Sequence, residues 1–186
     1  MGAYYYLAAQ LPYLIYGQPL PMSPAAFKDL AFGAMNSKEA ALLDFCTLDP
    51  APLPDGNYAE PSRKTPSSLI NRFKEWERVL RLNLARSRLQ KLKREGSIDA
   101  PDYPMDAAAV AKTALAIDSP LEAEIFLDKA RWDAIESFQG INSFSENAIY
   151  AYLLKLLLME RRMAFNTEEG FNEYKALYNA ILGEAK

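Results

Sequence analysis

The strongest constraint on the fold is the segregation of charge into one segment. Residues 67–95 read SSLINRFKEWERVLRLNLARSRLQKLKRE and contain nine Lys or Arg and three Glu, a net charge of 9 − 3 = +6. The whole chain has 21 basic and 24 acidic residues, so the remainder has 12 basic and 21 acidic residues, a net charge of −9. This pattern predicts one long basic helix that docks against its own acidic chain or onto a partner.

Composition excludes several classes of catalytic and metal site. The 186 residues include no histidine and a single cysteine, Cys46. Nucleophilic systems that use histidine, His-based metal sites and an internal disulfide are therefore excluded. No glycine-rich phosphate loop is present, and we expect a chain without enzyme activity of its own, without cofactor and without metal. Cys46 is expected to be a small core residue in a reducing compartment.

The apolar segments predict no membrane span. The N-terminal MGAYYYLAAQLPYLIYG lacks a basic region and is interrupted by tyrosines and Pro12, and the run at 153–158 contains Lys155. We expect a cytoplasmic protein that meets a membrane only indirectly, as a peripheral part of a complex at the inner membrane. The overall net charge of −3 disfavours non-specific binding to nucleic acid.

Helix start and stop signals predict a mostly α protein, an elongated bundle of about seven helices around the long basic helix. Residues 3–16 are open between a helix and an extended segment, because the three tyrosines at 4–6 suit either. The chain forms a single all-helical domain over 1–186, or two lobes in which 1–48 and 106–186 are a body, 49–66 a proline-rich loop and 67–95 the long helix. The signals place the other helices from Ser23-Pro24 to Gly33, from a Ser37 cap over Lys38–Cys46, from an Asp106 cap to Ile117, from Ser119 to Gly140, over 146–165, and from Thr167 to Gly183.

The basic helix has two apolar faces that point in nearly opposite directions. At 100° per residue, one face lies in its first half and the other in its second half. Such a helix packs on different bodies at its two ends, or it kinks. Two interpretations remain open: it bridges two parts of its own fold, or its C-terminal half meets a partner. The first face holds Leu69, Phe73, Trp76, Leu80 and Leu84, and the second holds Leu82, Ala85, Leu89 and Leu92.

Helix 146–165 carries a carboxylate, Glu160, on an apolar stripe. A buried carboxylate needs a partner, and an arginine or Asn83 of the basic helix is a candidate. Glu77 precedes Arg81 by four residues and predicts an ion pair along the helix. Three interpretations of Glu160 stay open: a buried polar network that fixes helix register, a contact with a partner, or a catalytic acid.

Three stretches of the chain resemble a bacterial family whose members are typically encoded beside the genes of V-type rotary ATPases. They are YYYLAAQLPYL, ERVLRLNLARSRLQKL, and YAYLLKLLLMERRMAF followed by NTEEGF. The same pieces are similar to the C-subunit family of V/A-type ATPases, all-helical proteins that are known as d in eukaryotes and are about twice as long. In that family the helices have a Tyr-rich start and then Lys, Glu and Arg near their ends. This pattern is matched by Tyr152, Lys155, Glu160, Arg161 and Arg162. A weaker match in the earlier helix consists of Glu77, Arg81, Asn83 and Arg86.

The resemblance implies a non-enzymatic component or accessory of a rotary ATPase. It would link the central stalk to the membrane ring and take part in proton or sodium transport coupled to ATP, without a small-molecule substrate. The expected partner contacts are Arg78, Arg81, Arg88 and Lys91, and Asn83, Arg86 and Glu160 are the expected buried network. Charge reversal at Arg81 and Arg88 should then weaken assembly without unfolding the chain. The alternative is a helical module whose basic helix binds an acidic protein or nucleic acid.

Overall fold

The computed structural model describes residues 4–49, 64–93 and 98–163, and in these ranges the chain is all-helical, with no strand. The predicted mostly α fold is confirmed. The predicted helix from Thr167 to Gly183 lies outside the described residues, as does most of the proline-rich loop. The elements are α1 (Tyr5–Gln10), α2 (Pro24–Ala34), α3 (Ser37–Ala40), a 3-10 helix (Ala41–Phe45), α4 (Ser68–Lys91), α5 (Met105–Ala114), α6 (Pro120–Gln139) and α7 (Glu146–Met163).

Serine caps begin three of these helices. The hydroxyl oxygens of Ser23, Ser67 and Ser119 accept hydrogen bonds from backbone N–H groups three residues later, at 3.2, 3.2 and 3.3 Å. Each bond satisfies one of the N–H groups that a helix start leaves without a partner. Pro24 and Pro120 then occupy the first turn, where no N–H is needed. The predicted starts at Ser23 and Ser119 are confirmed.

Other predicted boundaries are wrong, for local reasons. Asn36, and not Ser37, caps α3, and the helix tightens into a 3-10 turn after Ala40. Asp106 does not cap α5, because its carboxylate accepts a hydrogen bond from the Trp76 indole at 2.8 Å. Gly33 lies inside α2, which continues to Ala34. At the N-terminus only Tyr5–Gln10 is helical, so the segment predicted as helix or strand is a short helix followed by irregular chain.

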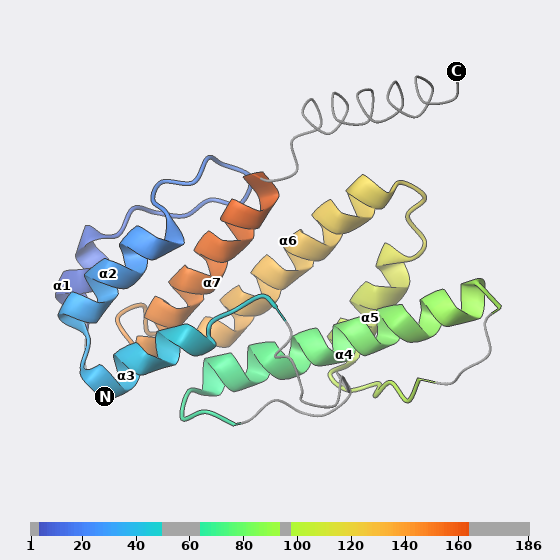
Figure 1. The fold of residues 1–186 in the computed structure, drawn as a ribbon, viewed down its shortest axis with the longest axis horizontal. Coiled ribbons are helices and arrows are strands. Elements are labelled where there is room, and N and C mark those ends of the chain that lie inside the picture. Colours follow the sequence, from blue (N-terminus) through green and yellow to red (C-terminus); the bar gives the residue numbers. More distant parts are fainter. Residues whose placement is uncertain (1–3, 50–63, 94–97, 164–186) are drawn as a thin grey trace, which may run out of the picture.

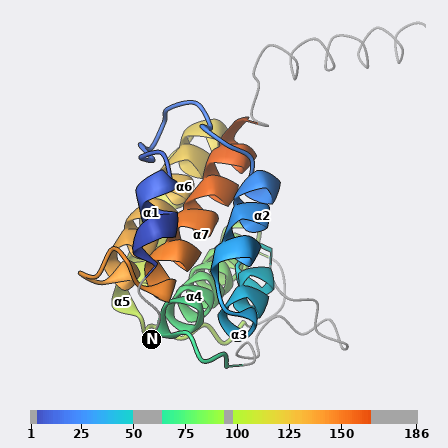
Figure 2. The same cartoon turned by 90° about the vertical axis from the view of Figure 1, so that its left-hand side faces the viewer.

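Helix α7 lies at the centre of one end of the molecule. Figure 2 shows α7 between α1 and α2, with α6 alongside it. Helix α4 crosses the lower part of the molecule in Figure 1, starting beneath α7 and extending away from it, with α5 packed along its second half. No helix among the described residues is long and apolar enough to cross a membrane.

The buried side chains form two clusters that α4 connects. The larger cluster joins α2, α3 and α7 to the start of α4, where Leu69, Ile70 and Phe73 are buried. The smaller cluster surrounds Trp76 and Leu80 and packs on a stripe of alanines from α5. Small side chains let α4 and α5 approach closely. The first apolar face of α4 is thus spread over two cores, and Leu92, on its second face, is 63% exposed.

Candidate functional site

A buried ion pair between α4 and α6 holds the two cores together. The Arg131 guanidinium donates to both carboxylate oxygens of Glu77, from Nε at 3.0 Å and from Nη2 at 3.1 Å. Its Nη1 also donates to Asp128 Oδ1 at 3.0 Å. All three residues are buried, with side-chain exposures of 9% or less. A bidentate pair of this kind fixes both the distance and the rotation between two helices.

The buried pair is extended at both ends into a chain of alternating charges. On α4, Arg81 Nε donates to Glu77 Oε1 at 2.7 Å, and its Nη2 donates to the backbone carbonyl of Leu48. On α7, Arg161 lies 3.9 Å from Asp128 and 3.1 Å from Glu124. We call this chain the charged junction. Its members are Arg81, Glu77, Arg131, Asp128, Arg161 and Glu124, from α4, α6 and α7.

The two buried carboxylates of the charged junction differ in electrostatics. Burial acts to raise the pKa of Glu77, but Arg131 and Arg81 outweigh it and hold that pKa below its ordinary value. Burial raises the pKa of Asp128 above its ordinary value, and Arg161 and Arg131 only partly oppose this. Burial also acts to lower the pKa of Arg131, but Glu77 and Asp128 keep it raised. Glu77 is therefore the main counter-ion of Arg131.

An open cleft of about 710 Å³ lies beside the charged junction, between the second half of α4, the first half of α6 and the end of α7. Two of its charged side chains, Arg88 on α4 and Glu160 on α7, are exposed and form no ion pair with the described part of the chain. The cleft is lined by Thr47, Leu48, Asp49, Arg81, Leu84, Arg88, Glu124, Leu127, Arg131, Leu157, Glu160 and Arg161.

The predicted burial of Glu160 is wrong. Glu160 is exposed at the rim of the cleft, three residues before α7 ends at Met163. Apolar residues on the preceding turns, such as Leu153 and Leu156, are fully buried, so the stripe itself is real. At the end of α7, Leu157, Glu160 and Arg161 line the cleft. The carboxylates buried between the helices are Glu77 and Asp128 instead.

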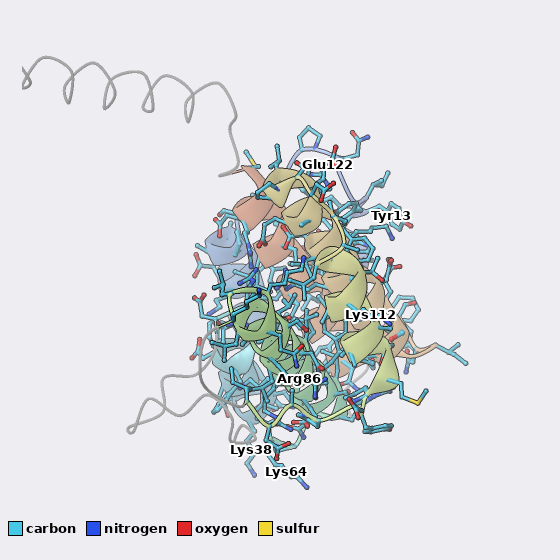
Figure 3. All side chains as sticks on the ribbon, turned by 90° about the vertical axis from the view of Figure 1, so that its right-hand side faces the viewer. Tyr13, Lys38, Lys64, Arg86, Lys112 and Glu122 are labelled. Atoms are coloured by element: carbon cyan, nitrogen blue, oxygen red, sulfur yellow. The ribbon has the colours of Figure 1, made fainter. Side chains whose placement is uncertain are left out.

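Asn83 and Arg86 form a second polar cluster, separate from Glu160. Asn83 is buried, and its amide donates to the carbonyls of Val79 and Pro101 at 2.9 Å each. Arg86 donates to Asn83 Oδ1 at 2.7 Å and to the carbonyl of Ala100 at 3.1 Å. Figure 3 looks onto this end of α4, where Arg86 is labelled, with α5 and its Lys112 beside it. The cluster ties the second half of α4 to the segment that leads into α5.

The four arginine and lysine residues expected at a partner contact fall into two groups. Arg78 pairs with Glu75 at 2.5 Å, and Arg81 belongs to the charged junction. Arg88 and Lys91 are exposed near the end of α4, where the Lys91 amine donates to the carbonyl of Leu115. Because Arg81 contacts Glu77 and the carbonyl of Leu48, we expect reversal of its charge to disturb the fold as well as any partner contact.

Two kinds of reactive group bear on catalysis in the described residues: clusters of metal ligands and a reactive thiol. No cluster of three or more His, Cys, Asp or Glu that could hold a metal ion is present in the described ranges. Burial raises the pKa of the Cys46 thiol to about 12, so this thiol is protonated at neutral pH. The charged junction pairs its acids with arginines, which suits it to holding helices in place.

Sequence patterns do not identify the most buried charges, Asp128 and Arg131. They are three residues apart on α6, next to Leu127 and Trp132, which are buried. The sequence signal for a buried charge is a charged residue within an apolar stripe, and Glu160 shows the same signal although it is exposed. The partner of Arg131 is 54 residues away, and no local spacing identifies it.

Four of the five α7 residues that carry the resemblance to the C-subunit family make internal contacts, and the fifth, Glu160, is exposed. The Tyr152 hydroxyl donates to the carbonyl of Pro12 at 2.8 Å, and Lys155 donates to Glu136 at 3.1 Å. Arg161 belongs to the charged junction, and Arg162 lies over the Tyr16 ring at 4.8 Å. Comparison of the chain with protein-family models, with curated proteins and with solved structures finds no match in any of the three.

Proposed function

We propose that the chain is a non-catalytic assembly protein of a V/A-type rotary ATPase, a component or accessory that contacts the central stalk and membrane ring. It would serve proton or sodium transport coupled to ATP through rigid contacts rather than bond chemistry. The choice of this machine rests on the resemblance carried by residues 4–14, 77–92 and 150–171. The choice of an assembly role rests on the arrangement of α4.

One observation carries the assembly role: α4 is anchored from its start through Arg86 and exposes cations at its end. The charged junction and the Asn83 cluster fix the helix to α6 and to the segment before α5. Beyond these anchors, Arg88 and Lys91 are exposed, and so is Leu92. A helix that is well packed at one end transmits force to whatever its other end contacts. Exposed cations beside an apolar side chain suit an acidic protein surface.

Most cations in the first half of α4 are engaged inside the chain, which disfavours nucleic acid as the partner. Arg72 lies 4.5 Å from the centre of the Phe138 ring, and Lys74 lies 5.0 Å from that of Phe45. Arg78 and Arg81 pair with glutamates. A nucleic-acid surface needs several cations that can each reach a phosphate. The exposed end of α4 supplies too short a row for tight binding.

Affinity purification of the tagged full chain from its own organism tests the proposal. We expect the nucleotide-binding and membrane-ring subunits of a rotary ATPase to co-purify in stoichiometric amounts. The double variant Arg88→Glu, Lys91→Glu should lose them, whereas Lys38→Glu, an exposed lysine on α3, should keep them. Absence of these subunits, when the rest of the machine remains assembled, would contradict the ATPase role. Loss of binding to random RNA at low salt in the double variant would instead favour the nucleic-acid alternative.

A further inference from the structure

Exposed charges of opposite sign lie together at one end of the molecule, which Figure 3 shows face on. Basic side chains gather where α4 and α5 end, and acidic side chains gather where α6 begins. The two groups are neighbours, because the Lys91 amine donates to the carbonyl of Leu115, three residues before Asp118. We call them the basic half and the acidic half of this face. The basic half comprises Arg88, Lys91, Lys93 and Lys112, and the acidic half comprises Asp118 and Glu122, all of them exposed.

The charges of both halves are available to another molecule. None of these side chains forms an ion pair with another described residue. Charges close to them in the sequence differ in this respect, because Arg86 pairs with Asp102 at 3.6 Å and Glu124 pairs with Arg161 at 3.1 Å. The face therefore presents both signs of charge to solvent, in two separate groups.

Each half also exposes apolar side chains. Leu92, in the basic half, is 63% exposed. Leu121 and Ile125, one turn apart on α6 in the acidic half, are 40% and 38% exposed. Apolar area within a charged surround is the usual composition of a protein contact surface. Both halves thus have the composition of a contact surface and differ in the sign of their charge.

We propose that this end of the molecule binds a second copy of the chain in a two-fold symmetric contact, with the basic half of each copy on the acidic half of the other. A two-fold contact uses the same surface on both copies, so that surface must complement itself. Two neighbouring halves of opposite sign meet this condition, and every charge pair then occurs twice. A partner of one sign would satisfy only one half. The inference goes beyond the proposed assembly role and does not depend on it.

The strength of this contact should depend on salt. Exposed ion pairs each contribute little and are screened by dissolved ions. The screening length falls from about 10 Å at 0.1 M salt to about 3 Å at 1 M. We expect analytical ultracentrifugation of the full chain to show a dimer whose fraction rises with protein concentration at the lower salt and falls at the higher salt. A monomer at every concentration, or a dimer unaffected by salt, would overturn the proposal.

Charge reversal in each half tests the symmetry of the contact. One variant carries Arg88→Glu and Lys91→Glu, and the other carries Asp118→Lys and Glu122→Lys. We expect each variant alone to dimerise more weakly by about tenfold or more, because like charges then face each other at both contacts. An equal mixture of the two should dimerise like the parent, since both contacts again join opposite charges. A mixture that stays monomeric, or a single variant that dimerises like the parent, would overturn the proposal.

Matched controls reverse single exposed charges at the other end of the molecule. Lys38→Glu on α3 and Asp29→Lys on α2 lie far from the end of α4 in Figure 1 and should dimerise like the parent. Weaker dimerisation in these controls, to the same extent as in the double variants, would overturn the assignment of the contact to this face.

The acidic half separates this inference from the proposed function. Both use the end of α4, but only self-association needs Asp118 and Glu122. The variant Asp118→Lys, Glu122→Lys should therefore lose the dimer and still co-purify with the subunits of the rotary ATPase. Failure of the ATPase role leaves the dimer of the purified chain intact, and a monomeric purified chain overturns the dimer whatever co-purifies with it.

Discussion

The two halves of α4 carry the same sign of charge but use it differently. Arg78, in the first half, and Arg81, just past the midpoint, each pair with a glutamate, and Arg131 of α6 also pairs with Glu77. In the second half, Arg88 is exposed without an ion pair to any described residue. A basic helix thus stabilises the fold where neighbouring helices supply carboxylates and is a candidate contact surface where they supply none. Charge composition alone does not distinguish the two uses.

The difference follows from the cost of removing a charge from water. A buried ion is stable only when a counter-ion and hydrogen bonds replace its hydration. Glu77, Arg131 and Asp128 meet that condition together, because each is bonded to another member of the charged junction. At the end of α4 water still solvates Arg88, so this charge needs no internal partner and remains available to another molecule.

The largest expected effect is at the centre of the charged junction. Arg131→Met should lower the free energy of unfolding by about 3–5 kcal/mol, because it leaves Glu77 and Asp128 buried with too little positive charge. Urea unfolding of the full chain measures this loss. The matched control on α6 is Lys129→Ala, which breaks an exposed pair with Asp133 and should cost less than about 1 kcal/mol. Similar losses in the free energy of unfolding in both variants would mean that the buried ion pair stabilises the fold no more than an exposed one.

A smaller loss is expected where the two halves of α4 meet. Asn83→Ala removes the amide that bonds to the carbonyls of Val79 and Pro101 and takes away one of the acceptors of Arg86. We expect a loss of about 1–3 kcal/mol, the usual cost of unsatisfied buried polar groups. Hydrogen exchange should show faster exchange near residues 98–102. A variant as stable as the parent would mean that this cluster does not anchor the helix.

The smallest effect concerns pH, and its sign differs between the two buried carboxylates. The pKa of Glu77 lies below its ordinary value of 4.5, so its ionised form adds stability that is present above pH 4.5 and is lost as pH falls through the lower folded pKa. The pKa of Asp128 lies above its ordinary value of 3.8, so it adds stability that is present below pH 3.8 and is lost as pH rises through the folded pKa.

Two amide variants separate these contributions. Glu77→Gln should flatten the decline in stability as pH falls below 4.5, and Asp128→Asn should steepen the decline as pH falls toward 3.8. Chemical unfolding across this pH range measures both slopes. The same change of slope in the two variants would contradict opposite pKa shifts.

The sequence predicts much of the fold but little of the charged junction. Caps at Ser23 and Ser119 are local, so spacing alone reveals them. Spacing also predicts a cap at Asp106, wrongly, because the Trp76 indole that binds its carboxylate lies 30 residues away. Glu160 and Glu77 show the same limit: both lie on or beside apolar stripes, and the packing of the neighbouring helices decides which is buried. Long-range pairing of charges depends on where helices converge, which helical periodicity does not specify.

Charge reversal at two positions of one helix tests the central claim most directly. Arg81→Glu and Arg88→Glu are made separately in the full chain, and urea unfolding is measured at the same salt and pH. We predict a loss of at least about 2 kcal/mol for Arg81→Glu, which places a second carboxylate against Glu77, and a change within about 0.5 kcal/mol for Arg88→Glu. Equal losses, or a stable Arg81→Glu variant, would contradict the division of α4 into a brace and an exposed contact surface.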